Sequence, residues 1–153
     1  MSLTLSIGDK APDFNLLDQY GKNISLSSFL GNELALFFYP KDNTPTCTTE
    51  VCNLRDYYAD LKNEGIEVVG ISPDSVKSHL NFATKHNLPY TLLSDENKDI
   101  AVKYGVWGEK QMYGRTYMGI IRTTFLIDAE GKIKLIFDKV ISKDHANQIL
   151  KNL

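Results

Sequence analysis

The order of apolar segments between Glu33 and Ile71 constrains the fold of this chain more than any other feature. Glu33 to Tyr39 is a short, nearly continuous apolar run, as expected for a strand buried on both faces. From Thr46 to Asn63 the apolar residues recur every three or four positions, which predicts an amphipathic helix ending near Gly65. Ile66 to Ile71 is a second strand-like run. A strand–helix–strand unit normally places its strands parallel, so we expect an α/β fold.

The segments on either side of this unit extend the sheet. Gly21 separates Phe14–Leu17 from Asn23–Leu26, which could form a small hairpin. Further strands and helices are expected at Ser75–Asn87 (helix), Tyr90–Leu93 (strand), Asn97–Tyr104 (helix), Thr123–Ile127 and Ile133–Phe137 (a strand hairpin), and Lys143–Asn152 (helix). The pattern predicts a thioredoxin-like domain spanning residues 1–153, with a central mixed β-sheet and helices on both faces.

Composition and charge narrow the possible functions. The chain has 153 residues and a formal net charge of -2, without a basic run, so charge gives no case for binding nucleic acid or an anionic membrane. The longest strongly apolar stretch, Leu34 to Tyr39, is far shorter than the ~20 residues of a membrane-spanning helix. The start, Met1 to Leu5, lacks the features of a signal peptide. We therefore expect a soluble, cytoplasmic protein.

Cys47 is one of two cysteines, and it lies between the predicted strand Glu33–Tyr39 and the body of the predicted helix Thr46–Asn63, in the first turn of that helix. Unpaired backbone N–H groups at a helix N-terminus favour a thiolate, which is the reactive form of a cysteine. The carboxyl end of a central strand is also where open α/β sheets usually bind ligands. Cys47 is therefore a candidate nucleophile, although a cytosolic cysteine is more commonly an inert buried residue.

A zinc site is a second interpretation of the two cysteines, Cys47 and Cys52. It needs two more ligands, and the three histidines, His79, His86 and His145, show no metal-ligand spacing to each other or to a cysteine. We expect His79 and His86 to be solvated or rim residues of their helix. The sequence therefore gives this binding function little support.

Pro40, Thr44 and Cys47 match the P-x-x-x-T-x-x-C signature of the peroxiredoxins. The longer string from Phe38 to Asp56 resembles the peroxiredoxin Q branch, also called bacterioferritin comigratory protein. The likeness continues in Leu92–Asp95, Tyr104–Lys110 and Ile121–Asp128, and so covers nearly the whole chain. One departure is Thr46, where the branch often carries glycine.

The resemblance implies a thiol-dependent peroxidase that reduces hydrogen peroxide and organic hydroperoxides without a cofactor. Cys47 would attack the peroxide and become a sulfenic acid. Thr44 would hydrogen-bond near the thiolate, Pro40 would shield the site, and Arg122 would hold the thiolate and polarise the leaving oxygen. Glu50 matches a position that often orients the arginine. Arg122 can reach Cys47 only if Thr123–Ile127 runs antiparallel beside Glu33–Tyr39.

Cys52 occupies the position at which this branch often has a resolving cysteine. The resemblance therefore implies an intramolecular disulfide with Cys47, re-reduced by thioredoxin or a similar dithiol, in a monomer. In an intact helix the two Cα atoms would lie roughly 8.5 to 9 Å apart, whereas a disulfide needs about 4.4 to 6.8 Å. We therefore expect the first turns of the helix to unwind during turnover.

An alternative function on the same fold is thiol–disulfide exchange. An oxidoreductase of that kind normally carries C-x-x-C, whereas Cys47 and Cys52 are five residues apart. Arg122 would then have no evident role. A chaperone-like role, shown by some peroxiredoxins, has no specific support in the sequence.

Overall fold

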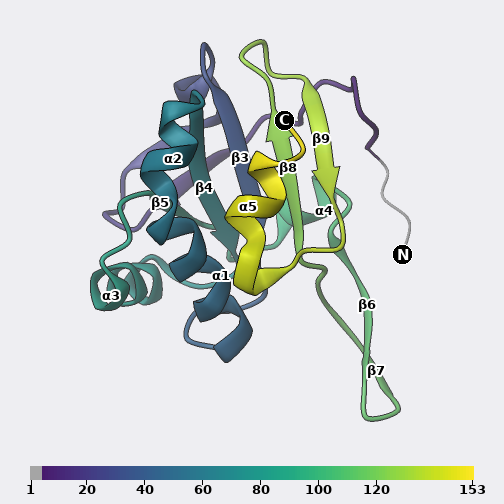
Figure 1. The fold of residues 1–153 in the computed structure, drawn as a ribbon. Helices are drawn as coiled ribbons and strands as arrows, with labels where there is room; N and C mark the ends of the chain where they lie inside the picture. Colours follow the sequence, from purple (N-terminus) through teal and green to yellow (C-terminus); the bar gives the residue numbers. More distant parts are fainter. Residues whose placement is uncertain (1–4) are drawn as a thin grey trace.

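The computed structural model describes residues 5–153, which form a seven-stranded mixed sheet with helices on both faces (Figure 1). The prediction that the start of the chain lacks a signal peptide concerns mainly residues 1–4, which lie outside the described residues. The strands are β1 (Asn15–Asp18), β2 (Asn23–Ser25), β3 (Glu33–Phe38), β4 (Ile66–Ser72), β5 (Thr91–Ser94), β6 (Trp107–Met112), β7 (Arg115–Ile120), β8 (Thr123–Ile127) and β9 (Ile133–Phe137). The helices are α1 (Pro45–Asp56), α2 (Tyr58–Asn63), α3 (Val76–His86), α4 (Asp99–Lys103) and α5 (His145–Leu150), with short 3-10 turns η1 (Leu26–Phe29) and η2 (Ser142–Asp144).

The order of strands in the main sheet is β2-β1-β5-β4-β3-β8-β9. β3, β4 and β5 run parallel, as the strand–helix–strand pattern predicts. β8 pairs antiparallel with β3, and the register places Thr123 opposite Phe38. The expected juxtaposition of the Thr123–Ile127 and Glu33–Tyr39 segments is therefore confirmed. It brings Arg122, the residue just before β8, to the carboxyl end of β3.

The sheet separates two apolar clusters, because successive side chains of β3 point to opposite faces. Leu34, Leu36 and Phe38 pack with α4 and the N-terminal segment, whereas Ala35 and Phe37 pack with α1, α2, α3 and α5. Figure 1 shows α1, α2 and α5 in front of the sheet and α4 behind it. The predicted mixed sheet with helices on both faces is confirmed.

The structure differs from the sequence prediction at the end of α1. At Tyr57 the backbone leaves helical geometry (φ -109°, ψ 14°), so the predicted helix Thr46–Asn63 is divided into α1 and α2. Leu54, before the break, and Leu61, after it, are both fully buried in the same cluster. The break thus leaves the apolar stripe intact, which is why periodicity alone did not reveal it.

A second difference is the two-stranded hairpin β6–β7, which has no counterpart among the elements expected from the sequence. It projects from the body of the molecule (Figure 1) and turns at Tyr113 and Gly114, which both have positive φ. Most of its side chains are exposed, so it lacks the apolar alternation that marks a half-buried strand. Within residues 5–153 no helix has the length and apolar character to cross a membrane.

Candidate active site

Cys47 lies in the first turn of α1, close behind the carboxyl end of β3. The first hydrogen bond of α1 runs from the amide of Thr48 to the carbonyl of Thr44. The amides of Thr46 and Cys47 come earlier in the chain, where a helix offers them no carbonyl partner. Amides in this position point along the helix axis and favour a negative charge. Pro45, the first residue of α1, has no N–H, as is common at this position. The local sequence thus places a thiol at the positive end of a 12-residue helix.

Arg122 joins Cys47 to Glu50. Its Nη2 donates to Cys47 Sγ at 3.2 Å, and its Nη1 donates to Glu50 Oε1 at 2.5 Å. Cys47 is only 1% exposed and Glu50 is fully buried, so both contacts are shielded from water. The planar guanidinium can serve both groups at once because it carries several donors in a fixed geometry. The structure therefore brings together three of the residues predicted from the sequence.

Burial and mutual attraction shift the pKa values of Glu50 and Arg122. Burial raises the pKa of Glu50 to about 7, and the nearby Arg122 lowers it only in part. Burial also disfavours the charge on Arg122, but Glu50 and Cys47 outweigh it and raise the arginine pKa. Arg122 is thus always charged, whereas Glu50 titrates near neutral pH. The positive charge of Arg122 beside Cys47 is therefore permanent, whereas the negative charge of Glu50 depends on the pH.

His145 lies on the far side of Glu50, although nothing in the sequence pattern had connected it with this site. Its Nε2 is 3.9 Å from Glu50 Oε2, an oxygen that is buried without a hydrogen-bond partner among the described residues. His145 Nδ1 donates to Gln148 Oε1 at 2.8 Å, and Nε2 accepts from the Thr124 hydroxyl at 2.7 Å. Burial lowers the pKa of His145 to about 4, so the ring is neutral at pH 7.

Pro40 and Thr44 frame the loop between β3 and α1. The Thr44 hydroxyl donates to the carbonyl of Lys41 at 2.9 Å; no hydrogen bond from it to Cys47 or Arg122 occurs in the described structure. Its oxygen can still accept a hydrogen bond from a bound molecule. Asp42, in the middle of the loop, is tied to helix α3 through His79, with 2.7 Å between Oδ2 and Nδ1. The loop is therefore fixed from both ends and the middle.

Cys52 shares α1 with Cys47, and both are free thiols. Their separation of five residues within one intact helix corresponds to a rotation of about 140°. Cys52 is partly buried, and its Sγ lies 3.7 Å from Nδ1 of His86. Packing of α3 beside α1 thus gives Cys52 a histidine neighbour that spacing along the sequence did not reveal.

The expectation that His79 is solvated is wrong, because its side chain is fully buried. It lies with Asp42 and Asp74 in the one group of side chains within residues 5–153 whose spacing could hold a metal ion. Their polar atoms already bond to each other, to Ser72 and to the loop amide of Asp42. These hydrogen bonds give the cluster a structural role, and neither cysteine belongs to it.

Lys110 is a further residue that periodicity could not identify. Its Nζ donates to the carbonyl of Ile120 at 2.8 Å. Burial and the charge of Arg122 lower its pKa, whereas Cys47 opposes that shift. The hairpin thus supplies a second cation to the electrostatic field at Cys47.

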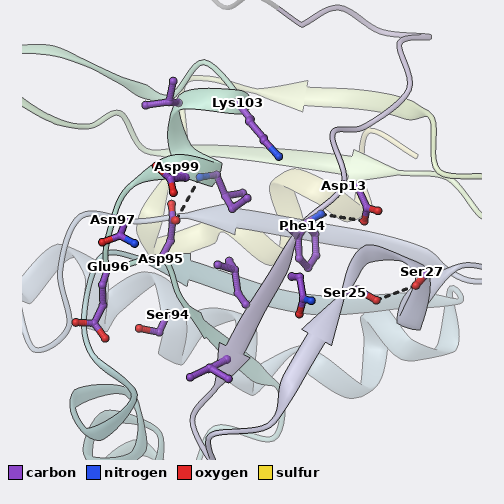
Figure 2. Close-up of a pocket in the computed structure, with 15 residues that line it drawn as sticks. Asp13, Phe14, Ser25, Ser27, Ser94, Asp95, Glu96, Asn97, Asp99 and Lys103 are labelled. Carbon is purple, nitrogen blue, oxygen red and sulfur yellow. Dashed lines mark hydrogen bonds between the residues drawn. The ribbon is translucent and has the colours of Figure 1, made fainter.

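A separate groove lies on the opposite face of the sheet (Figure 2). It runs between the Asp13–Leu17 segment and the residues from Ser94 to Lys103. Asp95 accepts there from the backbone amides of Ile100 (3.2 Å) and Ala101 (2.9 Å) and thereby holds the start of α4. Neither cysteine lines this part of the described surface, so we assign the groove no part in thiol chemistry.

Comparison with known proteins agrees with this geometry. Residues 7–136 match the AhpC/TSA family. The chain is 46% identical to the peroxiredoxin Bcp of Escherichia coli (95% of this chain, 94% of the relative) and 44% identical to that of Bacillus subtilis (99% and 96%). A structure of the Xanthomonas campestris bacterioferritin comigratory protein superposes with a TM-score of 0.87 at 34% identity (99% of this chain, 96% of the other).

The chain therefore belongs to the AhpC/TSA family, a class of thiol peroxidases with which its fold and two free thiols agree. Its relatives place it in the Bcp or peroxiredoxin Q branch, as the sequence motifs predicted, with the thioredoxin-like fold of that branch. It is a thiol-dependent peroxidase, an oxidoreductase.

Proposed function

We propose that Cys47 is the peroxidatic thiolate and that its contact with Arg122 carries the activity. A cation 3.2 Å from Sγ stabilises the thiolate, and the amides at the start of α1 add to this effect. The same guanidinium can stabilise the negative charge that develops on the departing oxygen. The thiolate attacks one peroxide oxygen, the O–O bond breaks, and Cys47 becomes a sulfenic acid while water or an alcohol leaves after protonation.

Pro40, Thr44 and Glu50 support this step. The Thr44 hydroxyl, which donates to Lys41, has lone pairs available to orient the peroxide. Pro40 shields the thiolate from bulk water, and Glu50 fixes the guanidinium plane through its hydrogen bond. The Xanthomonas campestris relative is described as having alkyl peroxide reduction activity. We propose that this chain accepts organic hydroperoxides as well as hydrogen peroxide.

Cys52 acts as the resolving cysteine. Its thiol condenses with the sulfenic acid, so that a Cys47–Cys52 disulfide and one water form. The first turn of α1 unwinds to allow this, because an intact helix keeps the sulfurs apart. A small dithiol protein of the thioredoxin kind then reduces the disulfide. One domain suffices for this cycle, because both cysteines and Arg122 come from the same chain, and the protein acts as a monomer. We place it in the cytoplasm.

The test is the stopped-flow rate of the reduced protein with hydrogen peroxide. We expect a second-order rate far above that of free cysteine, abolished in Cys47→Ser. A rate no greater than that of free cysteine, together with reduction of insulin disulfides, would replace the proposal with thiol–disulfide exchange. Consumption of peroxide coupled to thioredoxin and thioredoxin reductase would identify the electron donor, and sedimentation would give the oligomeric state.

A further inference from the structure

His86 lies beside the thiol of Cys52, on a different helix from both cysteines. It is the last residue of α3, and its Nδ1 is 3.7 Å from Cys52 Sγ, within the range of a sulfur hydrogen bond. Arg55 Nη1 donates to the backbone carbonyl of His86 at 2.9 Å and so fixes the end of α3 against α1. The ring also packs edge-on against Phe82, with 5.1 Å between ring centroids. The backbone of His86 is thus fixed by Arg55, and its imidazole is packed against Phe82 with Nδ1 beside the sulfur.

The side chain of His86 is neutral at pH 7 and can therefore accept a proton. Burial lowers its pKa, and the positive charges of Lys85 and Arg55 lower it further. Asp56 faces the same region but is paired with Arg55 at 2.9 Å, so its charge is already compensated. A neutral imidazole has one nitrogen lone pair, and a thiol has one S–H donor. The two groups are therefore complementary at neutral pH.

Cys52 lies in a part of α1 that is anchored to the body of the protein. The carbonyl of Val51 accepts from Tyr90 Oη at 2.7 Å. The side chain of Asn53 donates to the carbonyl of Lys143 (3.1 Å) and accepts from the amide of Ala146 (2.8 Å). These contacts reach β5, η2 and α5 or the residues next to them. Both chain neighbours of Cys52, Val51 and Asn53, are therefore anchored.

The turn that carries Cys47 has weaker anchors. Thr49 donates to the carbonyl of Pro45, a contact within the turn itself, and the long-range side-chain hydrogen bonds of this turn all involve Arg122. The contact between Arg122 and Cys47 changes when Cys47 becomes a sulfenic acid. Unwinding is therefore expected to stop near Val51, so that Cys47 moves to a Cys52 that stays beside His86.

We propose that His86 is the catalytic base that deprotonates Cys52 for disulfide formation. This inference rests on the proposed roles of the two cysteines. The proton of the Cys52 thiol passes to His86 Nδ1, and the thiolate attacks the sulfur of the Cys47 sulfenic acid. The S–S bond forms as the S–OH bond breaks, and the departing hydroxide takes up one proton to give water. His86 returns to its neutral form, and no external oxidant is consumed beyond the peroxide of the first step.

The test separates the two steps by rapid acid quench and mass spectrometry of the sulfenic and disulfide forms. In His86→Gln we expect the Cys47 sulfenic acid to form at the wild-type rate. Disulfide formation at pH 7 should slow by about 10- to 100-fold, at or below the usual contribution of a general base. The residual rate should rise about tenfold per pH unit toward the ionisation of an unassisted thiol at ~8.5, whereas the wild-type rate stays nearly flat.

His86→Ala provides a readout that a structural role would not produce. Added imidazole should restore part of its rate of disulfide formation, whereas Thr84→Ala, an exposed substitution on the same helix, should match wild type with or without imidazole. A disulfide rate in both His86 variants equal to wild type between pH 6 and 9 would overturn the role of His86. Failure of the wild type to form a Cys47–Cys52 disulfide would instead overturn the proposed function.

Discussion

Asp42 and His79 form a buried pair, with 2.7 Å between Asp42 Oδ2 and His79 Nδ1 and both side chains at most 1% exposed. His79 Nε2 lies 2.9 Å from the carbonyl of Leu93, which can only accept, so this nitrogen carries a hydrogen. Tyr39 and Ser78 also donate to the Asp42 carboxylate. The loop between β3 and α1 is thus tied to α3 and β5 through the side chain of Asp42.

We expect His79→Leu to lower the free energy of unfolding by about 3 kcal/mol, because it leaves a buried carboxylate without its main partner. Ser78→Ala removes one of the three donors and should cost only about 1 kcal/mol. Urea unfolding followed by circular dichroism measures both values. Equal effects of the two substitutions would show that the histidine is not the principal partner of Asp42.

Arg122→Lys should slow the reaction of Cys47 with hydrogen peroxide by about 100-fold, the usual effect of losing one stabilising donor in a reactive site. A lysine ammonium is a single point charge and cannot bond Glu50 and Cys47 in the same planar geometry. Stopped-flow kinetics of the first oxidation step gives the rate. Lys134→Ala, which removes an exposed ion pair with Glu33, is the control and should leave the rate unchanged.

Cys52→Ser should react once with peroxide at the wild-type rate and then lose turnover with thioredoxin. Because its sulfenic acid cannot form the intramolecular disulfide, it should proceed to the sulfinic form at lower peroxide concentration than wild type. Mass spectrometry after stepwise addition of peroxide follows both products. Continued turnover would mean that an external thiol resolves Cys47.

Glu50→Gln should change how stability depends on pH. The folded-state pKa of Glu50 is raised from 4.5 to about 7, so the folded protein binds more protons than the unfolded chain between these values. The contribution of Glu50 is therefore full below pH 4.5 and is lost as the pH rises through 7. Glutamine does not titrate, so the variant should gain on wild type by up to about 3 kcal/mol across this window.

His145 changes the free energy of unfolding in the opposite direction as the pH rises. The effect of Glu50 must therefore be measured as the difference between Glu50→Gln and wild type. Its folded pKa is lowered from 6.5 to about 4, so its contribution is present above 6.5 and is lost as the pH falls through 4. In wild type the two trends offset each other between pH 4.5 and 6.5. A difference curve between Glu50→Gln and wild type that stays flat from pH 4 to 7.5 would contradict the raised pKa.

Oxidation should unwind only the start of α1. We expect amides of residues 47 to 53 to exchange faster with deuterium in the disulfide form than in the reduced form. Although the backbone unwinds only as far as Val51, the amides up to residue 53 lose the carbonyl partners that lie four positions earlier. Amides of residues 55 to 61 should keep their protection, because the anchors at Val51 and Asn53 remain. Hydrogen exchange with mass spectrometry resolves the two segments. Identical protection of residues 47 to 53 in both forms would rule out unwinding.

Much of the fold was accessible from the sequence because its central strands are continuous apolar runs. The segment around Cys47 was also accessible, since a strand, a loop with two prolines and an amphipathic helix follow one another directly. The position of Arg122 needed one further inference, the antiparallel pairing of β8 with β3, and the register of Phe38 with Thr123 confirms it. Local pattern thus sufficed to single out Cys47, whereas Arg122 was identified through the resemblance to the peroxiredoxins and the strand pairing that this resemblance required.

The buried histidines could not be predicted in the same way. His79 and His145 occupy interior positions because specific partners satisfy their ring nitrogens, and those partners come from distant segments. A hydrophobicity pattern treats histidine as polar and places it at the surface. The contact of His86 with Cys52 likewise depends on how α3 packs beside α1, which no spacing within either helix encodes.

Cys47 is a member of the apolar cluster between the sheet and α1, as well as the proposed nucleophile. The proposed unwinding of α1 during turnover would therefore break some of the same contacts as global unfolding. Substitutions that improve the packing of this cluster would raise the thermal stability of the protein but slow its turnover at low temperature. Substitutions that weaken the packing would do the reverse. The packing around one sulfur atom would then set the temperature range in which an organism can use this enzyme.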